Sequence, residues 1–431
     1  MPLPLEGVRV LDLGVVLAGP QASMVLGDLG AEVIRVESTQ HFPPQTRGIF
    51  AHPTMEAVMA SIPVAGGYPK RDPGERPWNR FPWFNTTARN KLSMTVDLRK
   101  PRGQEVFRKL AAISDVIVTN QSPGTMEGFG LGYEALSAEN PGLIYVEASS
   151  FGAVGPYHGY RALGLQMEAF AGHDLLRQYR DRDVSSNTWA VTADASGALA
   201  MALAAEMALF ARRRTGRGQY IDVSMVENFV GLIGHAVLDY ATSGIVPESL
   251  GNRDYGAIQG CYKCAGEDRW LVLTLPDDDA WRAFVGAAGR PELLDDPMMA
   301  TTASRYAHHD EADRFISAWS AELSREDAVD KLRAAGVMAG PVLDDGDVLA
   351  DRHLAERGHF LDITQADTGT HRYPGFPYRF ANEPLRVRSA PVLLGEHNEY
   401  VYKSLLSVSE SEYAELVSEG HIGTEYAPHI R

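Results

Sequence analysis

Residues 7–37 read GVRVLDLGVVLAGPQASMVLGDLGAEVIRVE, and this stretch decides the fold class. An apolar run at residues 8–13 is typical of a buried strand, and a second run, AEVIRVE, occupies residues 31–37. Between them, a turn with Gly19 and Pro20 leads into apolar residues at helical spacing, which end at Gly30. This order predicts a βαβ unit. The stretch lacks the G-x-G-x-x-G pattern, so it does not indicate a dinucleotide-binding site.

The segments that follow repeat the alternation of strand and helix. Residues 91–98 alternate as a strand does, and residues 100–114 predict a helix with Pro101 near its start. DVIVTN at 115–120 and GLIYVEASSFG at 142–152 predict two further strands. We therefore expect an α/β fold with a parallel, doubly wound sheet. Polar loops after its strands, such as residues 119–124, lie where such sheets bind ligands.

Two other regions differ from this alternation in composition and in the order of predicted elements. Residues 39–83 are rich in proline, glycine and aromatic residues, which predicts a long ordered loop or insertion. From about residue 250, strands around CYKC (261–264) and RWLVLTL (269–275) precede several helices, which predicts a second, smaller α+β domain. Because Cys261 and Cys264 lie in a strand–turn–strand pattern, we interpret them as structural thiols rather than a redox pair or half a zinc site.

Composition excludes several classes of protein. The 431 residues carry a formal net charge of −16, which argues against nonspecific nucleic-acid binding. No secretory signal and no run of eighteen apolar residues is visible, so we expect no membrane span. Two cysteines fit a reducing compartment, and we expect a cytoplasmic protein.

A single carboxylate stands out at the start of an alanine-rich segment. Residues 196–214 predict a long helix that ends in three arginines and stops at Gly216. Asp194 or Ser196 would cap this helix, because both residue types are favoured at helix starts. Asp194 is therefore either an ordinary cap or a nucleophile, and the residues alone favour the cap.

Five separated segments resemble the class III CoA-transferases in order and spacing: residues 7–37, 90–103, 115–136, TGRGQYIDVSM at 215–225 and APVLLGEH at 390–397. That family includes formyl-CoA and carnitine-type CoA-transferases and 2-methylacyl-CoA racemases. The resemblance covers nearly the whole chain. It implies a large Rossmann-like CoA-binding domain whose first part is residues 1–225, a small α+β domain with a linker at 226–345, and a linker and return to the large domain at 346–431. It also implies that two subunits form interlocked rings.

The resemblance also implies roles for residues. Asp194 precedes Thr215 by 21 residues, the spacing of the family's nucleophilic aspartate, so Asp194 is expected to be catalytic. A position at a helix start is compatible with this role, since it should keep the carboxylate ionised. Acyl-CoA and a carboxylic acid are the expected substrates, with no permanently bound cofactor and no metal. The residues implied for CoA binding are Val16, Leu17, Ala18, Arg35, Val96, Asp97, Leu98, Arg99, Asn120, Gln121 and Ser122.

The sequence departs from the family in ways that matter. Ser38 and Gly128 stand where some members have arginine, and we expect Arg35 or Arg89 to compensate. Only Gly256 and Gly260 remain of the poly-glycine loop of formyl-CoA transferase, which argues against oxalate as the acceptor.

Two alternatives stay open. A 2-methylacyl-CoA racemase needs a His-Asp pair, but Leu163 and Gly164 occupy those positions, and neither can move a proton. Gly164 also lacks the acid that many transferases keep there. The second alternative is a non-catalytic CoA-binding subunit of a heteromeric transferase. We expect a homodimer, or a heteromer with a paralogue.

Overall fold

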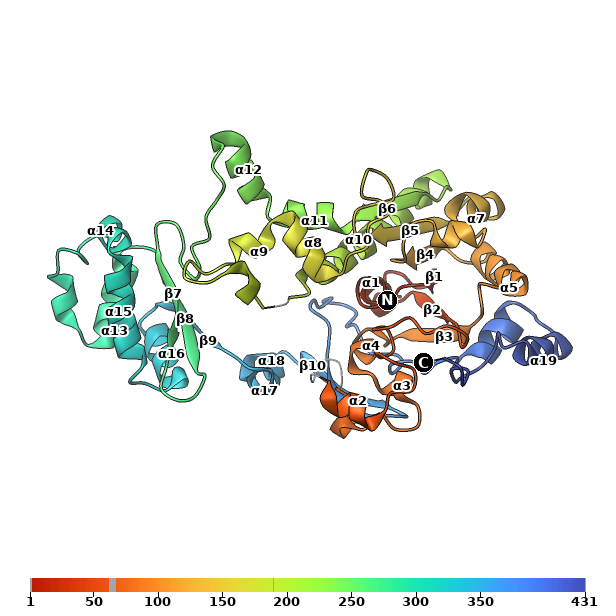
Figure 1. Cartoon of the computed structure of the whole chain (residues 1–431). Coiled ribbons are helices and arrows are strands. Elements are labelled where there is room, and N and C mark those ends of the chain that lie inside the picture. The colour runs from red at the N-terminus through yellow and green to blue at the C-terminus, as the bar shows by residue number, and fades with distance from the viewer. Residues whose placement is uncertain (1, 62–66, 189, 431) are drawn as a thin grey trace. The chain divides into compact units, whose positions relative to one another are not determined.

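The computed structural model in Figure 1 describes residues 2–61, 67–188 and 190–430. The chain forms two compact units. The first contains the described parts of Met1–Ala171, Trp189–Leu238 and Gly358–Arg431, and the second those of Gly172–Thr188 and Asp239–Arg357. The first unit thus combines the beginning, a middle segment and the end of the chain.

A six-stranded sheet lies at the centre of the first unit, with the strand order β3-β2-β1-β4-β5-β6. Every neighbouring pair is parallel. The predicted parallel sheet is therefore confirmed, and the strand order reverses between β1 and β4. The strands are β1 Arg9–Asp12, β2 Glu32–Glu37, β3 Lys91–Thr95, β4 Val116–Thr119, β5 Ile144–Ser149 and β6 Tyr220–Ser224.

Helices cover both faces of this sheet, and each face has its own apolar core. Val10 packs with residues of α1, α10 and α11, whereas its neighbour Leu11 packs with residues of α5, α7 and α19. Successive strand residues point to opposite faces, so both faces are buried and the sheet is doubly wound. The helices of this unit that follow the strands are α1 Ala18–Asp28, α5 Pro101–Ala112, α6 Thr125–Gly128, α7 Tyr133–Glu139, α8 Gly164–Ala171, α10 Thr192–Thr215, α11 Met225–Leu232, the π-helix η4 Tyr400–Leu405 and α19 Glu410–Ser418.

The connection from β1 to α1 is tighter than the sequence indicated. Gly19 and Pro20 lie inside the first turn of α1, not in a turn before it. A Cβ atom on Gly14 would lie 2.6 Å from Pro20 N, and one on Gly19 would lie 2.5 Å from Asn120 Oδ1. Only glycine permits this approach, which brings the loop after β1 against the loop after β4.

Helix α10 also differs from its prediction. It begins at Thr192, and the side chain of its N-cap residue, Val191, makes no capping hydrogen bond. Asp194 is therefore the third residue of the helix, and the prediction that Asp194 or Ser196 is the cap is wrong. Gly216 ends the helix in the left-handed conformation, as predicted, with φ of 69°.

Within the described residues, α10 is the one helix whose length and composition would allow a membrane span. Its small residues pack against α1, and the helix also contacts β5. A core helix packed in this way can have the same length and apolar composition as a membrane-spanning helix.

Residues 39–83, predicted as a long ordered loop or insertion, contain several short helices in the part that the structure describes. They contain α2 Met55–Ala60, the 3₁₀ helix η1 Pro69–Arg71 and α3 Pro77–Arg80, and α4 Pro82–Thr87 follows; residues 62–66 lie outside the described part. Proline at the first position of three of these helices supplies the required φ angle. Asp367 anchors the segment, because its carboxylate binds Arg76 and Asn79, and its carbonyl oxygen accepts from Arg80. Asp367 lies in the turn of the antiparallel hairpin formed by β10 Phe360–Gln365 and β11 Gly369–Pro374.

The second unit combines an antiparallel sheet with several helices. Its antiparallel sheet has the order β7-β8-β9, and Leu271 packs with Trp281 and Ile316 in its core. Cys261 and Cys264 are free, and burial raises the pKa of both thiols, which fits structural rather than reactive cysteines. The elements are β7 Ile258–Lys263, β8 Trp270–Leu275, β9 Met338–Val342, α9 His173–Leu176, η2 Val184–Ser186, α13 Asp278–Ala288, η3 Pro291–Leu294, α14 Thr302–Ala307, α15 His309–Ser320, α16 Arg325–Ala334, α17 Asp345–Ala350 and α18 Arg352–Glu356. Helix α12 Gly234–Ser243 has residues assigned to both units.

Candidate active site

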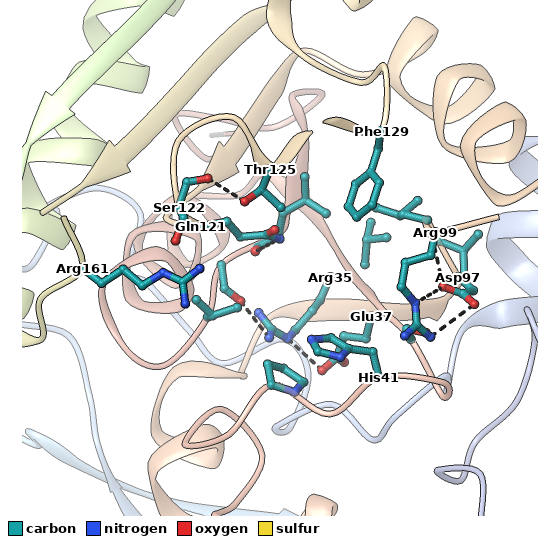
Figure 2. A pocket seen from close by; sticks show the side chains of 18 residues that line it. Arg35, Glu37, His41, Asp97, Arg99, Gln121, Ser122, Thr125, Phe129 and Arg161 are labelled. Atoms are coloured by element: carbon teal, nitrogen blue, oxygen red, sulfur yellow. Dashed lines mark hydrogen bonds and ion pairs between the residues drawn. The ribbon is translucent and has the colours of Figure 1, made fainter. Parts of the chain in front are cut away.

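A cavity of about 570 Å³ opens where the first four strands end (Figure 2). Its walls come from residues 13–15 after β1, 35–38 at the end of β2, 96–99 after β3 and 121–122 after β4. In a doubly wound sheet, ligands bind outside the carboxyl ends of the strands, where the strand order reverses. This cavity lies at that place.

The structure brings seven of the eleven predicted CoA-site residues to this cavity: Arg35, Val96, Asp97, Leu98, Arg99, Gln121 and Ser122. The other four, Val16, Leu17, Ala18 and Asn120, are not among the lining residues. Asn120 instead fixes the loop after β1, because its side chain accepts from Val15 N at 2.7 Å and donates to Val15 O at 3.0 Å. Ala18 is part of the apolar core.

Arg35 lines the cavity, but its guanidinium is already bound. It donates to Asp12 Oδ2 at 3.1 Å and to Gly14 O at 3.0 Å, and it lies 3.2 Å from Glu37 Oε1. Lys91 also binds Asp12, at 2.9 Å, and all of these side chains are buried. Burial lowers the pKa of Lys91 to about 8 although Asp12 opposes this. We therefore interpret Arg35 as a structural residue in the wall of the cavity, whose guanidinium is not free to bind phosphate.

Arg89 is also occupied. It binds both carboxylate oxygens of Asp28, at 3.1 and 2.7 Å, and this pair is buried. The expectation that Arg35 or Arg89 replaces the missing arginines therefore finds no free guanidinium at either residue.

Two other arginines offer exposed charge to the cavity. Arg99 is half exposed and binds Asp97 Oδ1 at 2.9 Å. Arg161 is exposed and lies on the opposite side of the cavity (Figure 2). His41 stands beside Arg99, and burial together with the Arg99 charge lowers the pKa of this imidazole. The three side chains can therefore offer two cations and a neutral ring to a ligand.

Arg161 is the functional candidate that sequence reasoning missed. Its segment forms no regular element and matches no recognised motif. The one available signal is that Arg161 is the only lysine or arginine between Ser150 and Leu176.

Asp194 lies beside a space that a glycine leaves open. A Cβ atom on Gly164 would lie 2.5 Å from Asp194 Oδ2, and Gly164 begins α8 three residues after Arg161. Two residues of the chain therefore separate Arg161, which lines the cavity, from the glycine beside the Asp194 carboxylate. Burial, and then the charge of Glu168, raise the pKa of Asp194 to about 6. The sequence predicts that the helix start keeps this carboxylate ionised; with a pKa of about 6 Asp194 is still ionised at neutral pH, although burial and a second carboxylate place its pKa above the ordinary value.

The positions of the racemase pair carry no proton donor or acceptor. Leu163 is half exposed and Gly164 is buried at the start of α8. The nearby His158 is exposed, and its Nδ1 lies 2.8 Å from Gly155 O. The geometry therefore does not restore the missing pair.

A doubly wound parallel sheet with a cavity at the switch point of its strand order is the arrangement of many enzymes that bind nucleotide-containing ligands. The chain belongs to CoA-transferase family III, whose profile matches residues 5–398. It is therefore an enzyme of the CoA-transferase class.

Named relatives agree with this membership. A succinyl-CoA–D-citramalate CoA-transferase from Chloroflexus aurantiacus is 32% identical over 416 residues, which cover 96% of this chain and 97% of that protein. The alpha subunit of a succinyl-CoA–L-malate CoA-transferase from the same species is 30% identical, with 96% of this chain and 92% of that protein covered. A solved structure of a CAIB/BAIF family protein from Brucella suis matches with a TM-score of 0.81 at 28% identity, covering 94% of this chain and 100% of that chain.

Proposed function

We propose that this enzyme moves CoA from an acyl-CoA to a carboxylic acid through an aspartyl-CoA thioester on Asp194. The observation that carries the proposal is the Asp194 carboxylate, which lies against the open space at Gly164. Its raised pKa of about 6 leaves it ionised at neutral pH, yet more basic than an ordinary aspartate. A more basic carboxylate is a better nucleophile toward a thioester carbonyl.

The nucleotide part of CoA would occupy the cavity at the strand ends. Arg99 and Arg161 supply positive charge from opposite sides, which suits phosphate groups. Phe129 and His41 offer ring surfaces to a base. The segment from Arg161 to Gly164 then leads from this cavity toward Asp194.

The proposed reaction needs four balanced steps. The Asp194 carboxylate attacks the thioester carbonyl, the C–S bond breaks, CoA leaves as a thiolate, and a mixed anhydride of Asp194 and the donor acid remains. The thiolate attacks the Asp194 carbonyl, which releases the donor acid and forms the aspartyl-CoA thioester. The acceptor carboxylate attacks this thioester and expels CoA thiolate, leaving a second mixed anhydride. The thiolate then attacks the acceptor carbonyl and releases Asp194, so one hard transfer becomes several easier ones.

The relatives suggest where a substrate search begins. Two of them are named for succinyl-CoA, with D-citramalate or L-malate as the partner acid. We propose succinyl-CoA as the first donor to test, against a panel of mono- and dicarboxylic acids. The two free thiols fit a cytoplasmic setting, which we propose as well.

We also propose an obligate dimer of interlocked subunits. Helix α10 exposes an apolar stripe at helical spacing, formed by Leu199, Leu203, Met207 and Phe210. An apolar face of this kind is normally covered by a partner. A second copy of the chain is the simplest partner, and a paralogue is the alternative because some relatives are alpha and beta subunits.

The mass of the intact protein tests the proposal. Incubation with succinyl-CoA should add the mass of a CoA thioester to the wild-type chain, and hydroxylamine should replace it with a hydroxamate. Asp194→Asn should show neither adduct and should retain less than about a hundredth of the turnover. A wild-type chain that binds CoA without any adduct would favour the non-catalytic subunit. Rapid exchange of the α-proton of a 2-methylacyl-CoA in deuterium oxide would favour the racemase.

A further inference from the structure

A second carboxylate is buried beside the proposed nucleophile, and the four transfer steps do not use it. Glu168 is only 1% exposed. It lies four residues after Gly164 on α8, and residues at this spacing share one face of a helix. The Asp194 carboxylate occupies the space next to Gly164, so a larger acid at position 164 would collide with it. Glu168 provides an acid one turn further along the same face.

Glu168 makes a defined contact with the helix that carries Asp194. Its Oε1 accepts a hydrogen bond from Ala193 N at 3.1 Å, and this bond is buried. Ala193 is the second residue of α10, where a backbone N–H has no partner within the helix. Val191 at the N-cap supplies no side-chain bond. Glu168 thus does from α8 what a capping side chain does in other helices.

We infer that Glu168 is a positioning residue of the transfer reaction, which fixes the start of α10 and strengthens Asp194 as a base. The contact sits on the residue immediately before Asp194, so it sets the direction from which that carboxylate faces the Gly164 space. The negative charge of Glu168 opposes any loss of basicity at the helix start. This inference rests on the proposed nucleophilic role of Asp194.

Other acids on the elements around α10 have different settings. Asp28 on α1 is paired with Arg89, and Glu147 on β5 accepts from Tyr220. Glu227 on α11 is exposed, and Glu206 lies three turns further along α10. Among the described residues, Glu168 is the charged group that raises the pKa of Asp194, in addition to burial.

The test compares three variants by the pH dependence of kcat/KM. Glu168→Gln keeps an oxygen for Ala193 N and removes the charge, so the acid limb near pH 6 should move toward the ordinary aspartate value of 3.8. Glu168→Ala also removes the contact, and kcat/KM should fall by roughly a hundredfold. Glu206→Gln is the control, because Glu206 lies on α10, the helix of Asp194, and burial raises its pKa as well. The acid limb of this variant should stay at the wild-type position.

The outcomes separate this inference from the proposed function. If Glu168→Gln keeps both the wild-type limb and the wild-type rate, the inference is overturned, while an aspartyl-CoA adduct in the same preparation leaves the proposed function standing. If Asp194→Asn still forms the adduct, both fail. If Glu168→Ala does not fold, the near-isosteric Glu168→Gln carries the test.

Discussion

The carboxylate of Asp194 occupies space that a side chain on Gly164 would need: a Cβ atom on Gly164 would lie 2.5 Å from Oδ2 of Asp194. The two residues are 30 positions apart, on α8 and α10. Real Cβ atoms essentially never approach another atom so closely. The glycine is therefore a condition for the observed position of the carboxylate.

This relationship predicts the effect of a single methyl group. Gly164→Ala should displace the Asp194 carboxylate and lower the rate of CoA-adduct formation by roughly a hundredfold. Stability should change little, since alanine is favoured over glycine within a helix. Gly159→Ala, in the same segment but with nothing within 4 Å of the new Cβ atom, is the control. Wild-type adduct formation in Gly164→Ala would contradict the role of this space.

The raised pKa of Asp194 predicts how activity depends on pH. Activity should be lost as the pH falls through about 6, because the attacking carboxylate becomes protonated. This limb should appear in kcat/KM for succinyl-CoA. A limb near pH 4 would mean that burial does not control this group.

The same shift predicts a change in stability. The pKa of Asp194 is higher in the folded state than its ordinary value of 3.8, so the folded protein binds the extra proton and loses stability as the pH rises between these values. Asp194→Asn cannot ionise, so its Tm should exceed that of the wild type at pH 7.5, and the difference should vanish below pH 4. An Asn variant that is less stable at pH 7.5 would contradict this sign.

Arg161 and Arg35 both line the cavity, but substitutions at these two residues should affect different properties. Arg161→Ala removes an exposed charge, so the Kd for CoA should rise roughly ten- to a hundredfold, the range of a bond to a charged group, while Tm stays the same. Calorimetry with CoA measures the first effect. Arg217→Ala, another exposed arginine, should leave the Kd unchanged.

Arg35→Met should act on stability instead. It breaks buried bonds to Asp12 and Glu37 but leaves each carboxylate one cation, Lys91 or Arg47, so stability should fall by less than the penalty of about 3–5 kcal/mol for a fully unpaired buried charge. Urea unfolding measures this loss. A variant of wild-type stability with weakened CoA binding would make Arg35 a ligand-binding residue after all.

The proposed interlocked assembly predicts a dimer that does not dissociate on dilution. Threaded chains separate only by unfolding, so nanomolar protein should remain dimeric over hours in analytical ultracentrifugation. Leu203→Glu places a charge in the exposed stripe of α10 and should prevent assembly of soluble dimer. A folded monomer in reversible equilibrium would contradict the threading.

The sequence by itself determined the sheet and the general class of enzyme. Strands β1 and β4 are short runs of mostly apolar residues, a pattern that can be recognised from neighbouring residues alone. The same holds for the end of α10, where Gly216 takes a conformation that few other residues adopt. One continuous helix, α10, contains both Asp194 and Thr215, so the 21-residue spacing between them is a feature of a single local element.

Only the tertiary structure decided what surrounds each functional group. Asp194 obtains its basicity from burial and from Glu168, 26 positions earlier, so no local pattern could reveal it. Arg35 is neutralised by Asp12 from a neighbouring strand, whereas Arg161 reaches the cavity from a segment without regular structure. Solvation and pairing of charges depend on contacts between distant segments, and these exist only once the chain has folded.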